Sequence, residues 1–358
     1  MNPTADYPST IPSGDHWMEA FSAGYFAMQS EADKTDEVDQ AKAFEMYIGY
    51  TNHYRTQPFI ALEAEADRSF PIPNSDYVAV GKLDTLVTIA DDPRKPLIQL
   101  EHKTGSRAAD GNPFPFATSA VNSQITNYAL CQAYAGQPLD YSIIDYIHVP
   151  QLRPKTIPLG TTKKPLGSRL EIENHQTYYH SPLSSPAKQL AKKGELNKEN
   201  IELFRYRLRY VIEKEPTKYF SRKSPIIRSE QDLINQRQKL EQLTRDIDRA
   251  AEEEDLGAYY QNTNYCMSFN SKCEFMSLCD GTDTEDSGEW EPRRGSTGSG
   301  KKNLSYSKAS CFMGCRRKFY YRYVKGLQKS GRDAKSLGIG NLFHVGLEHY
   351  YGKLIELA

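Results

Sequence analysis

The sequence predicts a mixed α/β fold. The first observation is a set of three segments that alternate between apolar and polar side chains or are rich in β-branched residues, as strands are: 59–67, 77–90 and 96–103. The second is a helical pattern over residues 116–136, which ends at a glycine. The third is a return to a strand-like pattern at 141–149. The order strand–strand–strand–helix–strand is typical of a mixed α/β core.

Helical segments are expected on both sides of this core in the sequence. Residues 14–54 place aromatic and apolar side chains at helical spacing, beginning with Trp17 and Phe21. Residues 181–256 are highly charged and mostly helical. One stripe of that region is apolar and includes Leu233, Leu240, Leu243 and Ile247. We interpret it as the buried face of a surface helix, because a coiled coil needs more heptads.

Residues 281–302 are predicted to be a linker, since they show no apolar periodicity. The stretch DSGEWEPRR within them is expected to contain no strand, and GSTGSG (295–300) resembles an engineered joint. A new folded segment is expected to begin after the linker, at residue 303.

Composition narrows the class of protein. The 358 residues carry 45 Lys and Arg against 46 Asp and Glu, a formal net charge of −1. A nucleic-acid site would therefore depend on locally sorted charge. No apolar run reaches the roughly 20 residues of a membrane helix, and the first residues lack the pattern of a signal peptide. We therefore expect a cytoplasmic protein with reduced thiols.

The strongest chemical signal combines Asp84 with Glu101 and Lys103. Side chains alternate along a strand, so Glu101 and Lys103 share one face while His102 points to the other. If 77–90 and 96–103 form a hairpin, Asp84 lies across from that face. Two carboxylates suit Mg²⁺ or Mn²⁺, and a neighbouring lysine suits phosphodiester hydrolysis. The alternative is a solvent-exposed strand face with an ordinary Glu–Lys pair.

Two predicted helices contain further candidate site residues. Gln124 and Tyr128 lie four residues apart on the helix after the third strand, and thus share a face. His344 lies in another predicted helix, in SLGIGNLFHVGLEHYYG. Taken alone, such a histidine is more often structural than functional.

At these motifs the sequence resembles the PD-(D/E)XK nuclease superfamily, in its RecB-type branch. The resemblance rests on GKLDTL, LIQLEHKTG and QITNY, on SYSKASCFMGCRRKFYYRYVKGL with LGIGNLFHVGLEHYY, and on CMSFNSKCEFMSLC. It implies a restriction-endonuclease-like core with extra helical elements and an iron–sulfur segment. It also implies a metal-dependent, phage-like DNA exonuclease that prefers single-stranded ends and leaves 5′-phosphates. The alternative is a nuclease-like DNA-binding module that recruits a helicase or recombination partner.

The resemblance also assigns roles to individual residues. It implies that His344, Asp84 and Glu101 are ligands of Mg²⁺ or Mn²⁺, together with the carbonyl oxygen of His102. Lys103 matches the catalytic lysine. Gln124 and Tyr128 match the motif that lines the DNA path beside the active site.

Five of the six cysteines fall between residues 266 and 315, which in a reducing compartment indicates metal or iron–sulfur ligation. The resemblance implies a 4Fe–4S cluster held by Cys266, Cys273, Cys279 and Cys315. The six-residue spacing between Cys266 and Cys273 departs from the common pattern, so Cys311 could take the place of Cys266. A zinc site or a set of reduced core thiols would also account for these cysteines.

The motifs occur in an unusual order, because the segment that opens the family fold comes last here. We interpret the chain as a circular permutant joined through GSTGSG, the alternative being a natural fusion of two partial nucleases. The expected division is into the following parts: a helical part, 1–58; the catalytic core, 59–150; a strand and helical extension, 151–256; the cysteine-rich segment, 257–280; the linker, 281–302; and the permuted helical segment, 303–358.

A basic and aromatic run over residues 316–325 is a candidate nucleic-acid contact. An amphipathic helix that buries its aromatic side chains is compatible with the same sequence.

Overall fold

The computed structural model describes residues 14–106, 122–154, 201–222, 225–253, 256–268, 271–293, 302–330 and 338–358. Expectations for 1–13, 107–121, 155–200 and GSTGSG lie outside these residues. Within the described part of the chain, no helix is long and apolar enough to cross a membrane.

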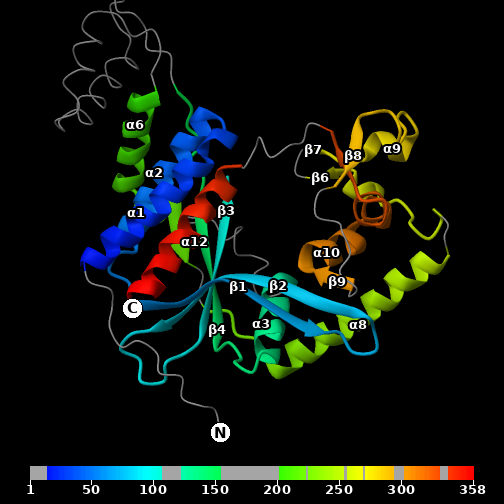
Figure 1. The fold of residues 1–358 in the computed structure, drawn as a ribbon, viewed down its shortest axis with the longest axis horizontal. Helices are drawn as coiled ribbons and strands as arrows, with labels where there is room; N and C mark the ends of the chain where they lie inside the picture. The colour runs from blue at the N-terminus through cyan, green and yellow to red at the C-terminus, as the bar shows by residue number, and fades with distance from the viewer. Residues whose placement is uncertain are drawn as a thin grey trace, which may run out of the picture.

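A six-stranded mixed sheet forms the centre of the fold (Figure 1), as predicted for an α/β core. Its strands are β1 (Phe59–Pro71), β2 (Tyr77–Ile89), β3 (Ile98–Gly105), β4 (Tyr141–His148), β5 (Phe220–Arg222) and β9 (Lys302–Ser305). The order is β1-β2-β3-β4-β5, with β9 beside β2. The β2–β3 pair is antiparallel, which confirms the predicted hairpin, and β3–β4 and β2–β9 are parallel.

Strand β2 changes partner along one of its edges. Strand β1 pairs with it along almost its whole length and so occupies the other edge. On the first edge, β9 pairs with residues 77–80 and β3 with residues 85–87. Residues 81–84 therefore lie at a fork between two partners, and Asp84 stands at this fork.

Helices on one side of the sheet build the largest core. They are α1 (Gly14–Glu31), α2 (Glu37–His53), α6 (Ile201–Lys214) and α12 (Ile339–Leu357), with a short 3₁₀ turn at Ala32–Lys34. Helices α1 and α12 lie side by side in Figure 1 although they come from opposite ends of the chain. Their contact needs glycine, because a Cβ at Gly24 would lie 2.3 Å from the carbonyl oxygen of Gly346.

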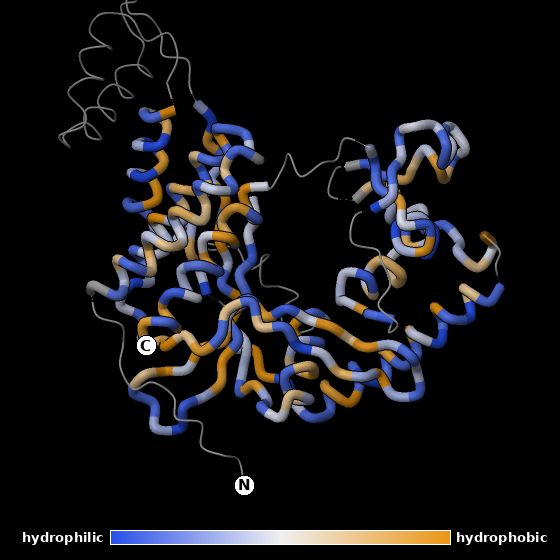
Figure 2. The backbone as a smooth tube through the Cα atoms, in the orientation of Figure 1, coloured by the Kyte–Doolittle hydropathy of each residue, from blue (hydrophilic) through white to orange (hydrophobic). Residues whose placement is uncertain are grey.

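A second group of helices covers the other part of the sheet. It consists of α3 (Ser123–Tyr134), α8 (Glu230–Glu252), α10 (Tyr306–Gly314), α11 (Arg316–Phe319) and a π-helical turn (Tyr320–Val324). The short helix α7 (Pro216–Tyr219) belongs instead to the first group, because it contacts α6 and buries Tyr219 in the large core. Hydrophobic residues recur along the otherwise hydrophilic α8 (Figure 2). Leu240, Leu243 and Ile247 are buried and Leu233 is half-buried, which confirms the predicted apolar stripe.

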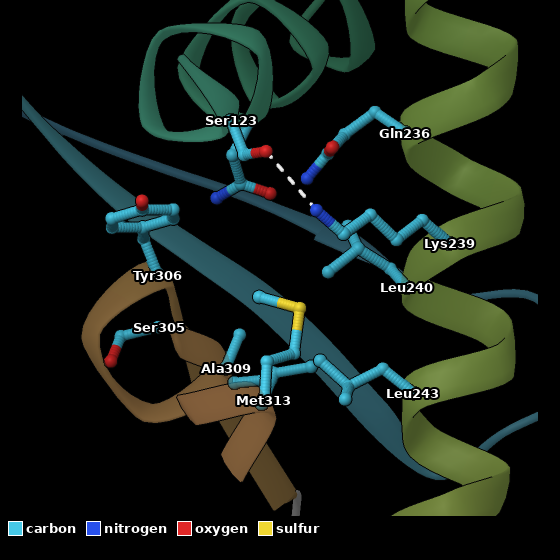
Figure 3. Close-up of a pocket in the computed structure, with 11 residues that line it drawn as sticks. Ser123, Gln236, Lys239, Leu240, Leu243, Ser305, Tyr306, Ala309 and Met313 are labelled. Atoms are coloured by element: carbon cyan, nitrogen blue, oxygen red, sulfur yellow. Dashed lines mark hydrogen bonds between the residues drawn. The ribbon is translucent and has the colours of Figure 1, made fainter. Parts of the chain in front are cut away.

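Helices α3, α8 and α10 meet around a cavity of about 10 Å³ (Figure 3). Lys239 Nζ of α8 donates a hydrogen bond of 3.1 Å to Ser123 Oγ of α3 across it. Asn127 also lines the cavity, and its Oδ1 atom has no hydrogen-bond partner among the described residues.

The remaining elements form what we call the cysteine lobe, residues 256–293 and 311–330 with the gap at 269–270. Besides α11 and the π-helical turn it contains a 3₁₀ turn (Thr263–Tyr265), β6 (Met267–Ser268), β7 (Ser271–Lys272), α9 (Met276–Asp280), β8 (Trp290–Pro292) and β10 (Leu327–Lys329). The expectation that DSGEWEPRR contains no strand is wrong, since β8 pairs with β10. Trp290 is buried against Phe275, at a ring distance of 5.2 Å. One large apolar side chain anchors this stretch, and a single such residue leaves no periodicity in the sequence.

Candidate active site

Asp84 is fixed at the fork of the sheet by its neighbours on β3 and α12. Its Oδ2 atom accepts a hydrogen bond of 2.8 Å from the backbone nitrogen of His102. The same oxygen lies 3.6 Å from His102 Nδ1 and 4.0 Å from His344 Nδ1. Burial acts to raise the pKa of Asp84, but the His102 hydrogen bonds and the two histidines outweigh it and hold the pKa below its ordinary value. Asp84 therefore favours the carboxylate form.

Three ligand groups from three different elements converge at this point. The ligand atoms of Glu65, Asp84 and His344 all lie within 4.8 Å of one another. Burial, assisted by His102 and Lys103 and opposed by Asp84, lowers the pKa of His344, so its imidazole favours the neutral, metal-binding form. Two carboxylates and one imidazole are a suitable donor set for Mn²⁺ and, with added water ligands, for Mg²⁺. The structure thus brings the predicted Asp84 and His344 together and adds Glu65.

Glu65 was not predicted as a site residue. It lies in β1 between Ala64, which pairs with Thr85, and Ala66, which pairs with Leu83, so it stands opposite Asp84. Its φ of 51° lies in the left-handed region, which is unusual for a residue with a side chain. Strained backbone of this kind is concentrated at functional sites. The sequence signal was a carboxylate within a strand, but its significance depends on a strand register that sequence alone does not give.

Glu101, Lys103 and Gln124 form a second, adjacent group. Lys103 Nζ donates to Glu101 Oε1 over 2.6 Å and to Gln124 Oε1 over 3.1 Å. This confirms that Glu101 and Lys103 share a face of β3. Gln124 Nε2 also lies 3.1 Å from Glu101 Oε1 and 2.8 Å from the Tyr128 hydroxyl, so the predicted Gln–Tyr pair shares one face of α3. Glu101 itself lies outside the group of three formed by Glu65, Asp84 and His344.

A buried chain of hydrogen bonds holds the other oxygen of Glu101. Gln99 Nε2 donates to Glu101 Oε2 over 3.0 Å, and Ser142 Oγ donates to Gln99 Oε1 over 2.9 Å. All three residues are almost fully buried. Burial and the nearby Asp84 charge raise the pKa of Glu101 to about 8, against the opposing effect of Lys103 and Gln99. Without a cation, this carboxyl is therefore mostly protonated at neutral pH.

His102 points away from Lys103, as the strand alternation predicted, and enters a buried polar network. Its Nε2 atom lies 3.1 Å from the hydroxyl of Tyr50 and 3.8 Å from Asp145 Oδ2. Tyr50 donates to Asp145 over 2.6 Å, and Arg222 pairs with the same carboxylate at 2.8 Å. The network holds the backbone of β3 at the residue that donates to Asp84.

Strands β6 and β7 lie between Cys266 and Cys273 and pair antiparallel, and we call this pair the β6–β7 hairpin. The backbone nitrogen of Cys273 lies 2.8 Å from the carbonyl oxygen of Cys266, so the unusual spacing still brings the two residues together. Burial raises the pKa of Cys279 to about 11, and the thiols of Cys273, Cys315 and Cys266 contribute to the increase. The four predicted ligands are thus close enough to influence one another.

Cys311 is also near this group. It lines a cavity of about 500 Å³ together with Cys273 and Cys315. All six cysteines are free thiols, and Cys131 is buried in α3, in a core cluster against which Cys311 also packs.

The basic and aromatic run at 316–325 is largely engaged within the protein. Phe319 and Tyr321 are buried, which fits an amphipathic helix for these two side chains. Arg317 binds backbone carbonyls of residues 256 and 259. Arg322 pairs with Glu274 at 2.9 Å.

Comparisons with known proteins add one finding to this geometry. No curated protein and no solved structure matches the chain significantly. A family model does match the segment that begins with β9 and ends with α12, the helix that supplies the imidazole beside Asp84. Over residues 303–358, the chain is similar to the PD-(D/E)XK nuclease superfamily.

Proposed function

We propose that this protein is a metal-dependent DNA nuclease, an exonuclease that acts on single-stranded ends and leaves 5′-phosphates. The observation that carries the proposal is the position of Lys103, whose ammonium group is held by Glu101 and Gln124 beside the Glu65–Asp84–His344 group. The superfamily similarity of residues 303–358 supports the same reaction class. The preference for ends and single strands rests on the sequence resemblance.

The donor set fits a divalent cation. Glu65, Asp84 and His344 would hold Mg²⁺ or Mn²⁺, and a bound cation would neutralise charge on the scissile phosphate. We propose Glu101 and the His102 carbonyl oxygen as further ligands, as the resemblance implies. The hydrogen bond from the His102 backbone nitrogen fixes Asp84 for this role.

Side chains of the protein supply the other functions that the reaction needs. Lys103 carries a positive charge toward the space beside the carboxylates, where it orients an attacking water and stabilises charge on a phosphate oxygen. Gln124 holds Lys103 in place and at the same time joins it to Tyr128. These two residues form the side of the site along which we propose that the DNA strand runs.

We further propose that Cys266, Cys273, Cys279 and Cys315 hold a 4Fe–4S cluster, as in the RecB-type branch. Four thiolates are the usual ligands of such a cluster. The β6–β7 hairpin supports the inclusion of Cys266, because it brings this residue to Cys273. The free state of all six cysteines is compatible with a reducing, cytoplasmic location.

We also propose that the chain is a circular permutant. The strands that carry Asp84 and Glu101 precede the matched segment 303–358, yet His344 of that segment lies beside Asp84. Helix α12 packs on α1, which is compatible with continuity between these two segments in a parent protein.

The test is degradation of end-labelled single-stranded DNA with Mn²⁺ or Mg²⁺, with a closed circle as the comparison substrate. We expect the linear strand to be degraded and the circle to be spared. Lys103→Ala should lower the rate by about 10²- to 10⁴-fold while the protein stays folded. Lys353→Ala, which removes a lysine near the end of α12, is the matched control and should retain full activity.

Full activity of Lys103→Ala would refute the assignment. DNA binding without degradation under any metal condition would favour a binding module that recruits a helicase or recombination partner.

A further inference from the structure

Two cavities lie on the side of the fold away from α1 and α12. The first, which we call the strand-side cavity, has a volume of about 560 Å³ and is lined by parts of β1, β2, α3, β9 and α10. Gln124 and Tyr128 form one wall, so this cavity adjoins the candidate active site. The second is the cavity of about 500 Å³ beside Cys273 and Cys315, which we call the cysteine-side cavity.

The two cavities share a boundary at the first turn of α10. Tyr306 and Ser307 line both of them. Ser307 is exposed and Tyr306 is half-buried. A flexible chain leaving the active site past Tyr128 would therefore pass this turn to reach the cysteine lobe.

The lining of both cavities is more basic than the protein as a whole. Arg68, Lys82 and Asp67 line the strand-side cavity, and the two cations pair with Glu63 and Glu65. Three cations line the cysteine-side cavity together with Glu274, and they are Lys272, Lys318 and Arg322. Among the lining residues, cations exceed carboxylates by one in the strand-side cavity and by two in the cysteine-side cavity, against a formal net charge of −1 for the whole chain.

Each cavity also has a tyrosine ring packed directly on a glycine. A Cβ at Gly81 would lie 2.7 Å from Tyr128 Cδ1, and a Cβ at Gly314 would lie 2.8 Å from Tyr265 Cε1. Tyr265 is 52% exposed and Tyr128 is 9% exposed, so Tyr265 is the ring of the two that faces solvent. Aromatic rings interleaved with basic side chains suit the bases and phosphates of a single strand.

We infer that the two cavities form one continuous path for a single strand of nucleic acid, which runs from the active site over the first turn of α10 into the cysteine lobe. This inference rests on the proposed function and specifies the route of its substrate. In this arrangement the cysteine lobe holds the strand as well as supporting the fold. A single strand fits better than a duplex, because each cavity is about the size that holds a small organic ligand.

The test introduces charge where the two cavities meet. Ser307→Asp places a carboxylate on the path, and Ser307→Asn provides a neutral side chain of the same size. Residue 307 lies in the first turn of α10, where an acidic side chain stabilises a helix. The Asp variant should therefore be at least as stable as the parent protein, so weaker binding would not be due to misfolding.

The measurement is fluorescence anisotropy with a labelled oligo(dT) strand in the absence of divalent cations. We expect Ser307→Asp to raise the Kd by about 3- to 10-fold and Ser307→Asn to leave it nearly unchanged. Gln137→Glu, an equal charge change at an exposed position between α3 and β4, should also have no effect. Photo-crosslinking of an iodouracil-containing strand should identify Tyr306 or Tyr265.

Binding that is equal for the Asp variant and the parent protein, or crosslinks confined to other elements, would overturn the path while leaving the nuclease proposal intact. A charge-specific loss of binding in a protein without metal-dependent degradation would support the path and refute the nuclease proposal. Absence of oligo(dT) binding by the parent protein would overturn the path.

Discussion

The backbone nitrogen of Cys273 lies 2.8 Å from the carbonyl oxygen of Cys266, which makes the two residues neighbours at the base of the β6–β7 hairpin. The six-residue spacing departs from the common pattern in the sequence, but the pairing of β6 with β7 brings Cys273 back beside Cys266. This relationship supports Cys266 rather than Cys311 as the fourth ligand of the proposed cluster.

We expect Cys266→Ser to remove most of the iron and the visible absorbance from anaerobically purified protein, because it would remove one thiolate of the proposed cluster. The measurement is the absorbance spectrum together with iron and sulfide content per chain. Cys311→Ser is the matched control and should keep both. The opposite result would assign the fourth position to Cys311, and colourless wild-type protein with one zinc would contradict the cluster.

Glu65→Gln should weaken binding of Mn²⁺. The substitution keeps the size of the side chain and removes its charge from the group with Asp84 and His344. Loss of an outer-shell partner already lowers metal affinity by about 10- to 100-fold, and loss of a direct ligand should cost at least as much. The measurement is calorimetric titration of metal-free protein.

Glu63→Gln is the control for this change. Glu63 lies two residues earlier in β1 and pairs with Arg68 rather than with the metal group. Equal Mn²⁺ affinity of the two variants would exclude Glu65 as a ligand.

The stability of metal-free protein should fall as the pH rises toward 9. Burial and the Asp84 charge raise the pKa of Glu101 from 4.5 to about 8 in the folded protein. Between these two pH values the folded protein holds a proton that the unfolded chain has released, so raising the pH favours unfolding. The stabilisation that this raised pKa gives the folded protein is complete below pH 4.5 and is lost as the pH passes 8.

This pH dependence is measured by urea unfolding across that range without divalent cations. Glu101→Gln should flatten the curve between pH 5 and about 9, since it removes the titrating group. Glu19→Gln, at an exposed position on α1, should leave the slope as it is. An unchanged slope in Glu101→Gln would show that another group is responsible.

Gly81→Ala should destabilise the protein and disturb the active site. The added Cβ would lie 2.7 Å from the Tyr128 ring, and overpacking of this kind costs about 1–3 kcal/mol in the free energy of unfolding. Displacement of Tyr128 should also lower activity through its hydrogen bond with Gln124.

Gly352→Ala provides the matched comparison. A Cβ there meets nothing within 4 Å, and the residue lies inside α12. Alanine should therefore raise the free energy of unfolding by about 0.5–1 kcal/mol, since it has the higher helix propensity. Equal stabilities of the two variants would contradict the close approach at Gly81.

Much of the central fold could be predicted from the sequence, because its signals are local. Strand alternation located β1 to β4, and the spacing of Gln124 and Tyr128 placed them on one face of α3. The shared face of Glu101 and Lys103 also followed from alternation alone.

The features that could not be predicted from the sequence depend on strand register and on contacts between distant segments. Glu65 gains its importance from standing opposite Asp84, which is fixed by the β1–β2 pairing. Gln99 shares the face of Glu101 by strand alternation, but its support comes from Ser142 of β4, which the β3–β4 pairing places beside it. The strand at Trp290 forms because a distant segment, β10, pairs with it.

The burial of Trp290 gives the protein a built-in optical probe. The chain has only two tryptophans, and the other, Trp17, is buried in the large core on the opposite side of the sheet from the cysteine lobe. Replacing either one with phenylalanine leaves an emission signal that reports on a single region. Such variants would reveal whether the cysteine lobe melts together with the catalytic sheet or before it, without any attached dye.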